Sequence, residues 1–289
     1  MQIKTYENFR KIFGTNIQSV TARCKEFPKL KVSIITAPAE PRKIIAANYI
    51  TCIEGVMVYP SQIIDERADE LTNWVIAGGH TPALESVQIT FAIEGASVVL
   101  LKQISRHRIG NSLGVRTQRA NATNLLGKIG EEEHYITPPS FTDHPEVIEA
   151  YKKFMIDSQN LYNLCINKGI QQDEARYVIP QSGESIWQGT YAYITLMKNI
   201  CSTRMCHVMQ GEMVALSHMM GECVKEYDEM LGAALKPICM HTGACNRNEN
   251  NPTKDHPKGV CEFTVNGKIP ARKADDTLDL TQYSKDATK

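Results

Sequence analysis

The feature that most constrains the fold of this chain is an apolar segment that runs almost directly into a basic cluster. Residues 96–101 read Ala-Ser-Val-Val-Leu-Leu, and residues 103–108 read Gln-Ile-Ser-Arg-His-Arg. The apolar run is expected to be buried, and it would hold the two guanidinium groups and the imidazole next to the protein core. Adjacent side chains point in different directions, and arginine suits phosphate, carboxylate and planar carbonyl groups. The pattern predicts a site for planar anionic molecules; the alternative is a solvated charge cluster at the end of an element.

Composition narrows the class of protein. The 289 residues are enough for a full core, and 32 Lys and Arg balance 32 Asp and Glu, so no overall charge favours nucleic acid or membrane. Nine cysteines, an odd number scattered among apolar residues, fit a reducing compartment. The start does not resemble a signal peptide, and no apolar run approaches the ~18 residues of a membrane span. These observations predict a soluble cytoplasmic protein.

Hydrophobic periodicity predicts a mixed architecture. Residues 30–36 and 85–94 alternate as strands do, while 41–51, 61–77 and 96–103 are typical of helices, with Gly78-Gly79 ending the second helix. Residues 144–169 and 185–231 are expected to be strongly helical. The Gly-, Asn-, Ser- and Thr-rich residues 108–128 are expected to form a long loop.

Five blocks in order carry a family resemblance. They are Gly79-His80-Thr81-Pro82-Ala83-Leu84-Glu85 with Ile89-Thr90-Phe91; Arg106-His107-Arg108; His134-Tyr135-Ile136-Thr137-Pro138-Pro139; Gly169 with Glu174-Ala175-Arg176 to Pro180; and Asn199 with Arg204, Gln210 and Glu212. Together they resemble the motifs of the flavin-dependent thymidylate synthases, the thymidylate-synthase-complementing proteins. The resemblance covers about residues 30 to 230.

The resemblance implies the fold and the reaction. The expected class is α+β, a central, mostly antiparallel sheet with long helices. Residues 30–231 would form the domain, between an N-terminal extension, 1–29, and a C-terminal extension, 232–289. The implied activity is reductive methylation of deoxyuridine monophosphate at C5, with FAD, NADPH as reductant and methylenetetrahydrofolate as one-carbon donor. The implied assembly is a homotetramer whose subunits share active sites.

The resemblance also assigns roles to residues at matching positions. The flavin contacts would be His80, Glu85, Arg106, His107, Arg108 and Asn199. The nucleotide contacts would be Gln103, Arg106, Thr117, Arg119, Arg176 and Arg204. Of these, Arg204 is implied to be catalytic.

The chemistry of C5 methylation can follow two routes. A thiolate can add at C6, which requires a cysteine of lowered pKa in an electropositive pocket. Alternatively, a guanidinium facing the uracil edge stabilises negative charge on the ring, as an oxyanion hole would. Cys201 and Cys206 are the only cysteines close to a candidate site, and neither lies in a nucleophile motif. The resemblance assigns the guanidinium of the second route to Arg204, so that route is expected; the alternative for Arg204 is a helix-surface ion pair with Glu212.

Departures from the family pattern keep other functions open. The loop after Arg108 lacks the family's Glu, its Ser is replaced by Thr117 only after a shift of one residue, and Arg116 adds a cation. Tyr193 and Thr195 stand where the family has Asn and Arg, and Gly211 replaces a Trp.

One alternative is a paralogue that methylates or hydroxymethylates another deoxypyrimidine nucleotide. Another is a nucleotide-binding structural relative without flavin chemistry. A nucleic-acid-binding protein using Arg106 to Arg119 is disfavoured because no aromatic residues interleave.

The C-terminal extension contains a candidate metal site. Cys239, Cys245 and Cys261 with His256, or with His241, would form a tetrahedral Cys3His zinc set. The spacing lacks the C-x2-C signature, so a loosely ordered, thiol-bearing tail is the alternative.

Overall fold

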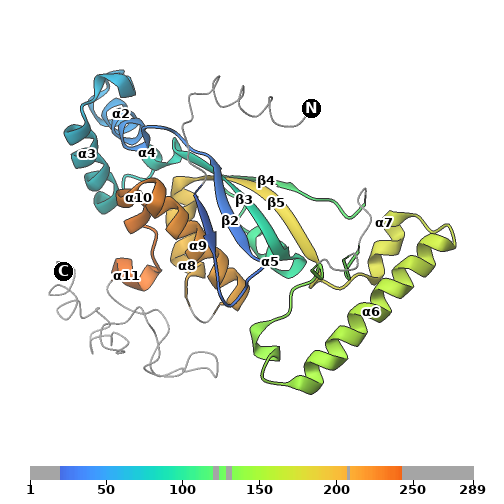
Figure 1. Ribbon diagram of the computed structural model, residues 1–289. Helices are drawn as coiled ribbons and strands as arrows, with labels where there is room; N and C mark the ends of the chain where they lie inside the picture. The colour runs from blue at the N-terminus through green and yellow to red at the C-terminus, as the bar shows by residue number, and fades with distance from the viewer. Residues whose placement is uncertain (1–19, 120–123, 128–131, 207–208, 243–289) are drawn as a thin grey trace, which may run out of the picture. The chain divides into compact units, whose positions relative to one another are not determined.

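The computed structural model describes residues 20–119, 124–127, 132–206 and 209–242. It divides into two compact units (Figure 1). Unit 1 comprises residues up to 37 together with 89–190, and unit 2 comprises 38–88 together with 191 onward. Each unit therefore combines segments that are far apart in the sequence.

Unit 1 is built on a five-stranded sheet. The strands are β1 (Thr21–Arg23), β2 (Lys31–Thr36), β3 (Gln88–Ser97), β4 (Asn111–Val115) and β5 (Glu184–Ala192), in the spatial order β1-β2-β3-β5-β4 (Figure 1). The β1–β2 and β2–β3 pairs are antiparallel. Along β5 the side chains alternate between buried and accessible, with Trp187 and Tyr191 buried and Ile186 exposed. One face of the sheet thus supplies the core of unit 1.

The end of β3 sets the position of the basic cluster. Gly95 has φ +66°, and a Cβ there would lie 1.9 Å from the Lys29 carbonyl oxygen, so only glycine fits. Ser97 then caps α5 (Val98–Ile104) by accepting a hydrogen bond from the Leu100 N–H at 3.0 Å. Leu100 and Ile104 are fully buried. The strand and the short helix therefore hold the residues that follow at a defined point.

The rest of unit 1 is dominated by the long helix α6 (Pro145–Asn167), with α7 (Gln172–Ala175) and the short 3-10 turns η2 (Pro139–Phe141) and η3 (Arg176–Val178) beside it. Met155 on α6 packs in a buried cluster with Leu125 and Tyr135. Tyr151 supports this cluster by donating a hydrogen bond to the Ile136 carbonyl at 2.8 Å.

Unit 2 is helical. Its first segment forms α2 (Pro41–Glu54), the 3-10 turn η1 (Pro60–Gln62), α3 (Asp65–Gly78) and α4 (Pro82–Glu85), and α2 packs along α3 (Figure 1). Its second segment forms the π-helix η4 (Thr195–Cys201), α8 (Ser202–Arg204), α9 (Gly211–Tyr227), α10 (Glu229–Ala233) and α11 (Ile238–Thr242). Across the described ranges, no helix is long and apolar enough to span a membrane.

Most predicted elements agree with the structure, and two were wrong. The segment 108–128 was predicted to be a loop, but it contains β4. The segment 185–231 was predicted to be helical, but it begins with β5. Both strands depend on tertiary pairing: β4 lies at the sheet edge beside β5, and the Arg116 N–H donates to the Ile186 carbonyl at 3.0 Å. The predicted α+β class is confirmed.

Candidate functional site

The predicted site residues are divided between the two units. Unit 1 holds Gln103, Arg106, His107, Arg108, Thr117, Arg119 and Arg176, whereas unit 2 holds His80, Glu85, Asn199 and Arg204.

The basic cluster of unit 1 forms a tight turn at the end of α5. The N–H groups of Arg106 and His107 donate to the carbonyls of Gln103 and Ile104, at 3.2 and 3.1 Å. The Asn111 side-chain amide donates to the His107 carbonyl. The Arg106 and Arg108 side chains are exposed, and within the described part of the chain neither forms an ion pair. The turn therefore presents two guanidinium groups on a fixed backbone.

A second group of cations gathers around Asp173. The Thr117 hydroxyl accepts the Arg119 N–H at 3.1 Å, which shapes the segment after β4. Arg119 Nε lies 3.9 Å from the Asp173 carboxylate, and Arg176 Nε donates to the Asp173 carbonyl at 3.1 Å. The structure thus brings Arg119 and Arg176 to one acidic residue, which the sequence analysis did not identify. The Asp173–Arg176 spacing of three residues was the available signal.

In unit 2, His80 stands at the end of α3 and Glu85 at the end of α4. The His80 ring meets the Tyr49 ring edge-on, with centroids 5.4 Å apart and planes at 86°. Its Nε2 atom is buried and has no hydrogen-bond partner in the part of the chain that the structure describes. The Glu85 side chain is exposed, while its carbonyl accepts a hydrogen bond from the Gln88 amide at 2.8 Å.

Asn199 and Arg204 lie on consecutive turns of η4 and α8. A π-helix adds a residue to a turn and occurs often at functional sites. Asn199 is exposed, and Arg204 is half-buried with Nη1 3.5 Å from the Met209 sulfur. Gln210, part of the same sequence block, caps α9 by accepting the Met213 N–H at 3.0 Å. Gln210 therefore has a structural role, while Asn199 presents its amide to the surface.

The cysteines flanking Arg204 differ in burial. Cys201 is fully buried, and burial raises the pKa of its thiol to about 12. A thiol of this kind is almost entirely protonated at neutral pH, so it is a poor nucleophile. Cys206 is half-buried. The fold thus closes the thiolate route at Cys201.

The departures at Tyr193 and Thr195 have a structural explanation, since both residues belong to the core. Tyr193 is fully buried, its hydroxyl donates to the Leu231 carbonyl at 2.7 Å, and burial raises its pKa. Thr195 is also buried. The Tyr193 hydroxyl therefore ties the residues just before η4 to α10, and both side chains are buried in the core.

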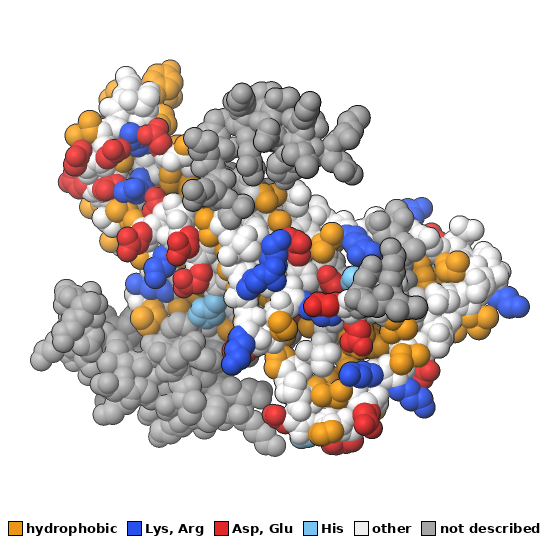
Figure 2. Space-filling view, in the orientation of Figure 1, with side chains coloured by type: hydrophobic (Ala, Val, Ile, Leu, Met, Phe, Trp, Pro, Cys, Tyr) orange, Lys and Arg blue, Asp and Glu red, His pale blue; other side chains and the backbone are white. Residues whose placement is uncertain are grey.

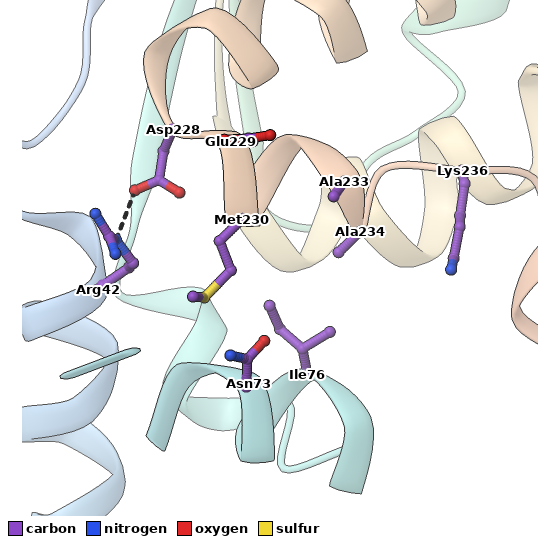
Figure 3. Close-up of a pocket in the computed structure, with 9 residues that line it drawn as sticks. All are labelled: Arg42, Asn73, Ile76, Asp228, Glu229, Met230, Ala233, Ala234 and Lys236. Atoms are coloured by element: carbon purple, nitrogen blue, oxygen red, sulfur yellow. Dashed lines mark hydrogen bonds and ion pairs between the residues drawn. The ribbon is translucent and has the colours of Figure 1, made fainter. Parts of the chain in front are cut away.

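A cavity of about 560 Å³ in unit 2 has none of the predicted site residues among the nine described residues that line it (Figure 3). Asn73 and Ile76 come from α3, and Met230 projects from α10. At one end, Arg42 Nε is bonded to the Asp228 carboxylate at 3.0 Å, and Arg42 also pairs with Asp69. The arginine at the cavity is therefore already neutralised by two carboxylates.

The zinc prediction lies mostly beyond the described residues. Cys245, His256 and Cys261 fall outside them, and only Cys239, half-buried on α11, falls inside. Within the described ranges, no three His, Cys, Asp or Glu side chains are grouped so that they could hold a metal ion.

Comparison with known proteins places this fold and these motifs in a family. A crystal structure of the UMP/dUMP methylase PolB from Streptomyces cacaoi, bound with 5-Br dUMP, has the same fold, with a TM-score of 0.58 at 17% identity over 71% of this chain and 93% of that one. The family model for thymidylate synthase complementing protein matches residues 33–228. This chain belongs to that family.

Relatives named flavin-dependent thymidylate synthase agree with the assignment. The protein from Pyrococcus furiosus is 30% identical over 186 residues, which cover 62% of this chain and 72% of the relative. The protein from Clostridium tetani is 27% identical over 234 residues, covering 75% and 90%. The predictions of the family and of an enzyme of this type are confirmed.

Proposed function

We propose that this chain is a cytoplasmic enzyme that converts deoxyuridine monophosphate to thymidylate by reductive methylation at C5. The one-carbon unit would come from methylenetetrahydrofolate and the electrons from NADPH through FAD. The observation that carries the proposal is the family match over residues 33–228, within which Gln103, Arg106-His107-Arg108, Arg176 and Arg204 are all present. The names of the relatives support the flavin and the product, and the 5-Br dUMP bound to PolB supports a uridine nucleotide as substrate.

The nucleotide phosphate suits the cations around Asp173. Arg119 is largely exposed, and its contact with Asp173 is long at 3.9 Å, so a phosphate could displace the carboxylate at little cost. Arg176 is held by the Asp173 carbonyl instead, which leaves the rest of its fork available. Thr117 would donate its hydroxyl to the same phosphate, and Gln103 and Arg106 would contact the nucleotide from the α5 turn.

The residues assigned to the flavin fit an anionic, planar cofactor. Arg106 and Arg108 present exposed guanidinium groups, which match a pyrophosphate. His80 offers a buried Nε2 without a described partner, and Asn199 offers an exposed amide; His107 and Glu85 complete the assigned set. Reduced FAD, when bound, supplies the hydride.

Arg204 would stabilise the charge that develops on the uracil ring. Its guanidinium is half-buried, so solvent screens it less than an exposed arginine. A carbonyl oxygen and an adjacent ring nitrogen could both be bonded by its fork. The protonated state of Cys201 supports this route over thiolate addition.

The first test is the absorption spectrum of the purified protein, followed by titration with deoxyuridine monophosphate. A flavin band at about 450 nm that shifts with nucleotide would support one shared site. A protein that takes up no FAD would favour the structural-relative alternative. Mass spectrometry of products from a panel of deoxypyrimidine nucleotides would separate methyl from hydroxymethyl transfer and identify the natural base.

We also propose a homotetramer with shared sites. The support is a row of exposed apolar side chains along α6, among them Phe154, Leu161 and Leu164. An apolar row on a long helix is costly in water and favours a protein partner. Light scattering should therefore give about four times the mass of the chain.

We propose that residues 30–231 form the catalytic domain and that the C-terminal extension binds one zinc ion. Cys239 would act with Cys245, Cys261 and His256 in the C-terminal extension, 232–289. Elemental analysis of protein purified without chelator should then find about one zinc ion per chain.

A further inference from the structure

The backbone of His80 is fixed by two turns. Gly79 adopts φ +74° and ends α3, with its N–H donating to the Val75 carbonyl at 3.1 Å. The Thr81 N–H then donates to the Gly79 carbonyl at 2.8 Å, and Pro82 begins α4. These contacts place the Cα of His80, but they leave the direction of its ring undetermined.

The His80 ring is not oriented through Nε2. That atom is buried and has no hydrogen-bond partner among the described residues. Histidines that serve at ligand sites are usually held through one ring nitrogen by a carbonyl or carboxylate. Nε2 therefore does not fix the ring of His80, and a packing contact is the candidate for doing so.

Tyr49 supplies a directional contact. Its ring meets His80 at 86° with centroids 5.4 Å apart, the geometry that the aromatic quadrupole favours. Tyr49 is itself anchored, because it packs on the buried cluster of Ala46, Ala47, Ile63, Ala68 and Leu71.

Trp74 supports Tyr49 from α3. The two rings have centroids 5.0 Å apart at 52°. A Cβ at Gly78 would lie 3.7 Å from the Trp74 ring, so the indole packs closely over that glycine. Trp74 nevertheless remains 53% exposed.

We propose that Tyr49 is a positioning residue that orients His80 for its ligand, with Trp74 as its support. The inference rests on the proposed function, in which His80 lies by the flavin. Within the described residues, the Tyr49 hydroxyl makes no hydrogen bond, so Tyr49 would orient His80 through the contact between the two rings. Without that ring, the imidazole of His80 turns toward a polar partner for Nε2.

The experiment compares Tyr49→Phe with Tyr49→Leu in the full-length protein. Phe keeps the ring and Leu removes it, so Phe should retain wild-type turnover while Leu lowers kcat about tenfold. The KM for deoxyuridine monophosphate should stay unchanged in both. Trp74→Leu should give a smaller loss of the same kind. Tyr59→Leu is the matched control, because Tyr59 is an exposed tyrosine of the same unit.

A second readout does not need activity. The ring protons of His80, assigned with His80→Asn, should shift in NMR spectra of Tyr49→Leu and stay in place in Tyr49→Phe. Equal loss in the Phe and Leu variants, or a wild-type kcat and unshifted His80 signals in Tyr49→Leu, would overturn the proposal. If the protein neither binds flavin nor turns over, the proposed function fails, but the NMR comparison still decides whether Tyr49 orients His80.

Discussion

Arginines occupy two opposite environments in this protein. In unit 2, Arg42 at the cavity is bonded to Asp228 and Asp69, and although burial opposes its charge, the two carboxylates raise its pKa (Figure 3). In unit 1, Arg106 and Arg108 project from the α5 turn without an ion pair in the described ranges. Two carboxylates already neutralise the charge of the first arginine. Arg106 and Arg108, by contrast, carry positive charges that only an added anion would neutralise.

The comparison shows why a local count of charges does not identify a site. Over the face shown in Figure 2, Lys and Arg side chains lie interspersed with Asp and Glu. What separates a structural arginine from a binding arginine is its partners, and these come from distant segments: Asp228 is far from Arg42 in sequence.

The largest expected effect is at Arg204. Arg204→Ala should lower kcat by at least about 100-fold, since a positioned donor to developing charge is lost. The flavin spectrum should persist, because Arg204 is not assigned to the flavin. Arg204→Lys should not restore the rate, because an ammonium lacks the planar fork. Wild-type turnover in Arg204→Ala would remove this residue from the mechanism.

Replacing Arg42 tests the structural side of the comparison. Arg42→Ala leaves Asp228, whose side chain is 6% exposed, with the Leu231 N–H but without its ion-pair partner, and should lower the free energy of unfolding by about 2 kcal/mol. This cost is below that for a fully buried pair because solvent reaches Arg42. Urea unfolding would measure it. The control is Arg67→Ala, which breaks the exposed pair with Glu70 and should cost less than about 0.5 kcal/mol.

Replacing Arg106 should weaken ligand binding and leave stability almost unchanged, the opposite of the result expected for Arg42→Ala. Arg106→Ala should change the free energy of unfolding by less than about 0.5 kcal/mol, because an exposed side chain without an ion-pair partner in the described ranges is removed. Binding of FAD or deoxyuridine monophosphate, followed by flavin absorbance, should weaken about 10- to 100-fold. Strong destabilisation with unchanged binding would contradict the distinction drawn between Arg106 and Arg42.

The smallest expected effect concerns Cys201. Its folded-state pKa of about 12 lies above the ordinary value of 9.0. The folded state therefore holds the proton more tightly, and this stabilisation is complete below pH 9 and is lost as pH rises toward 12. Between pH 7 and pH 10, wild type should lose about 1 kcal/mol more stability than Cys201→Ala in urea unfolding. An equal loss in both proteins would show that this thiol ionises in the folded state.

Much of unit 2 could be predicted from sequence because its signals are local. The helix expected over 41–51 is α2, and the Gly78-Gly79 ending of α3 follows from the left-handed φ that only glycine adopts at low cost. In unit 1, the long helix expected over 144–169 is α6. A 3.6-residue period is contained within each segment, so no tertiary partner was needed to recognise it.

The sequence by itself determined the family, the α+β class and the positions of the basic motif residues, because these depend on residue order and short-range periodicity. Only the tertiary structure decided that β4 and β5 are strands, that Tyr49 stands beside His80 with Trp74 against Tyr49, and that Asp173 gathers Arg119 and Arg176. Strand pairing and aromatic contacts join segments far apart in the chain. Their free energy arises only when the fold brings those segments together.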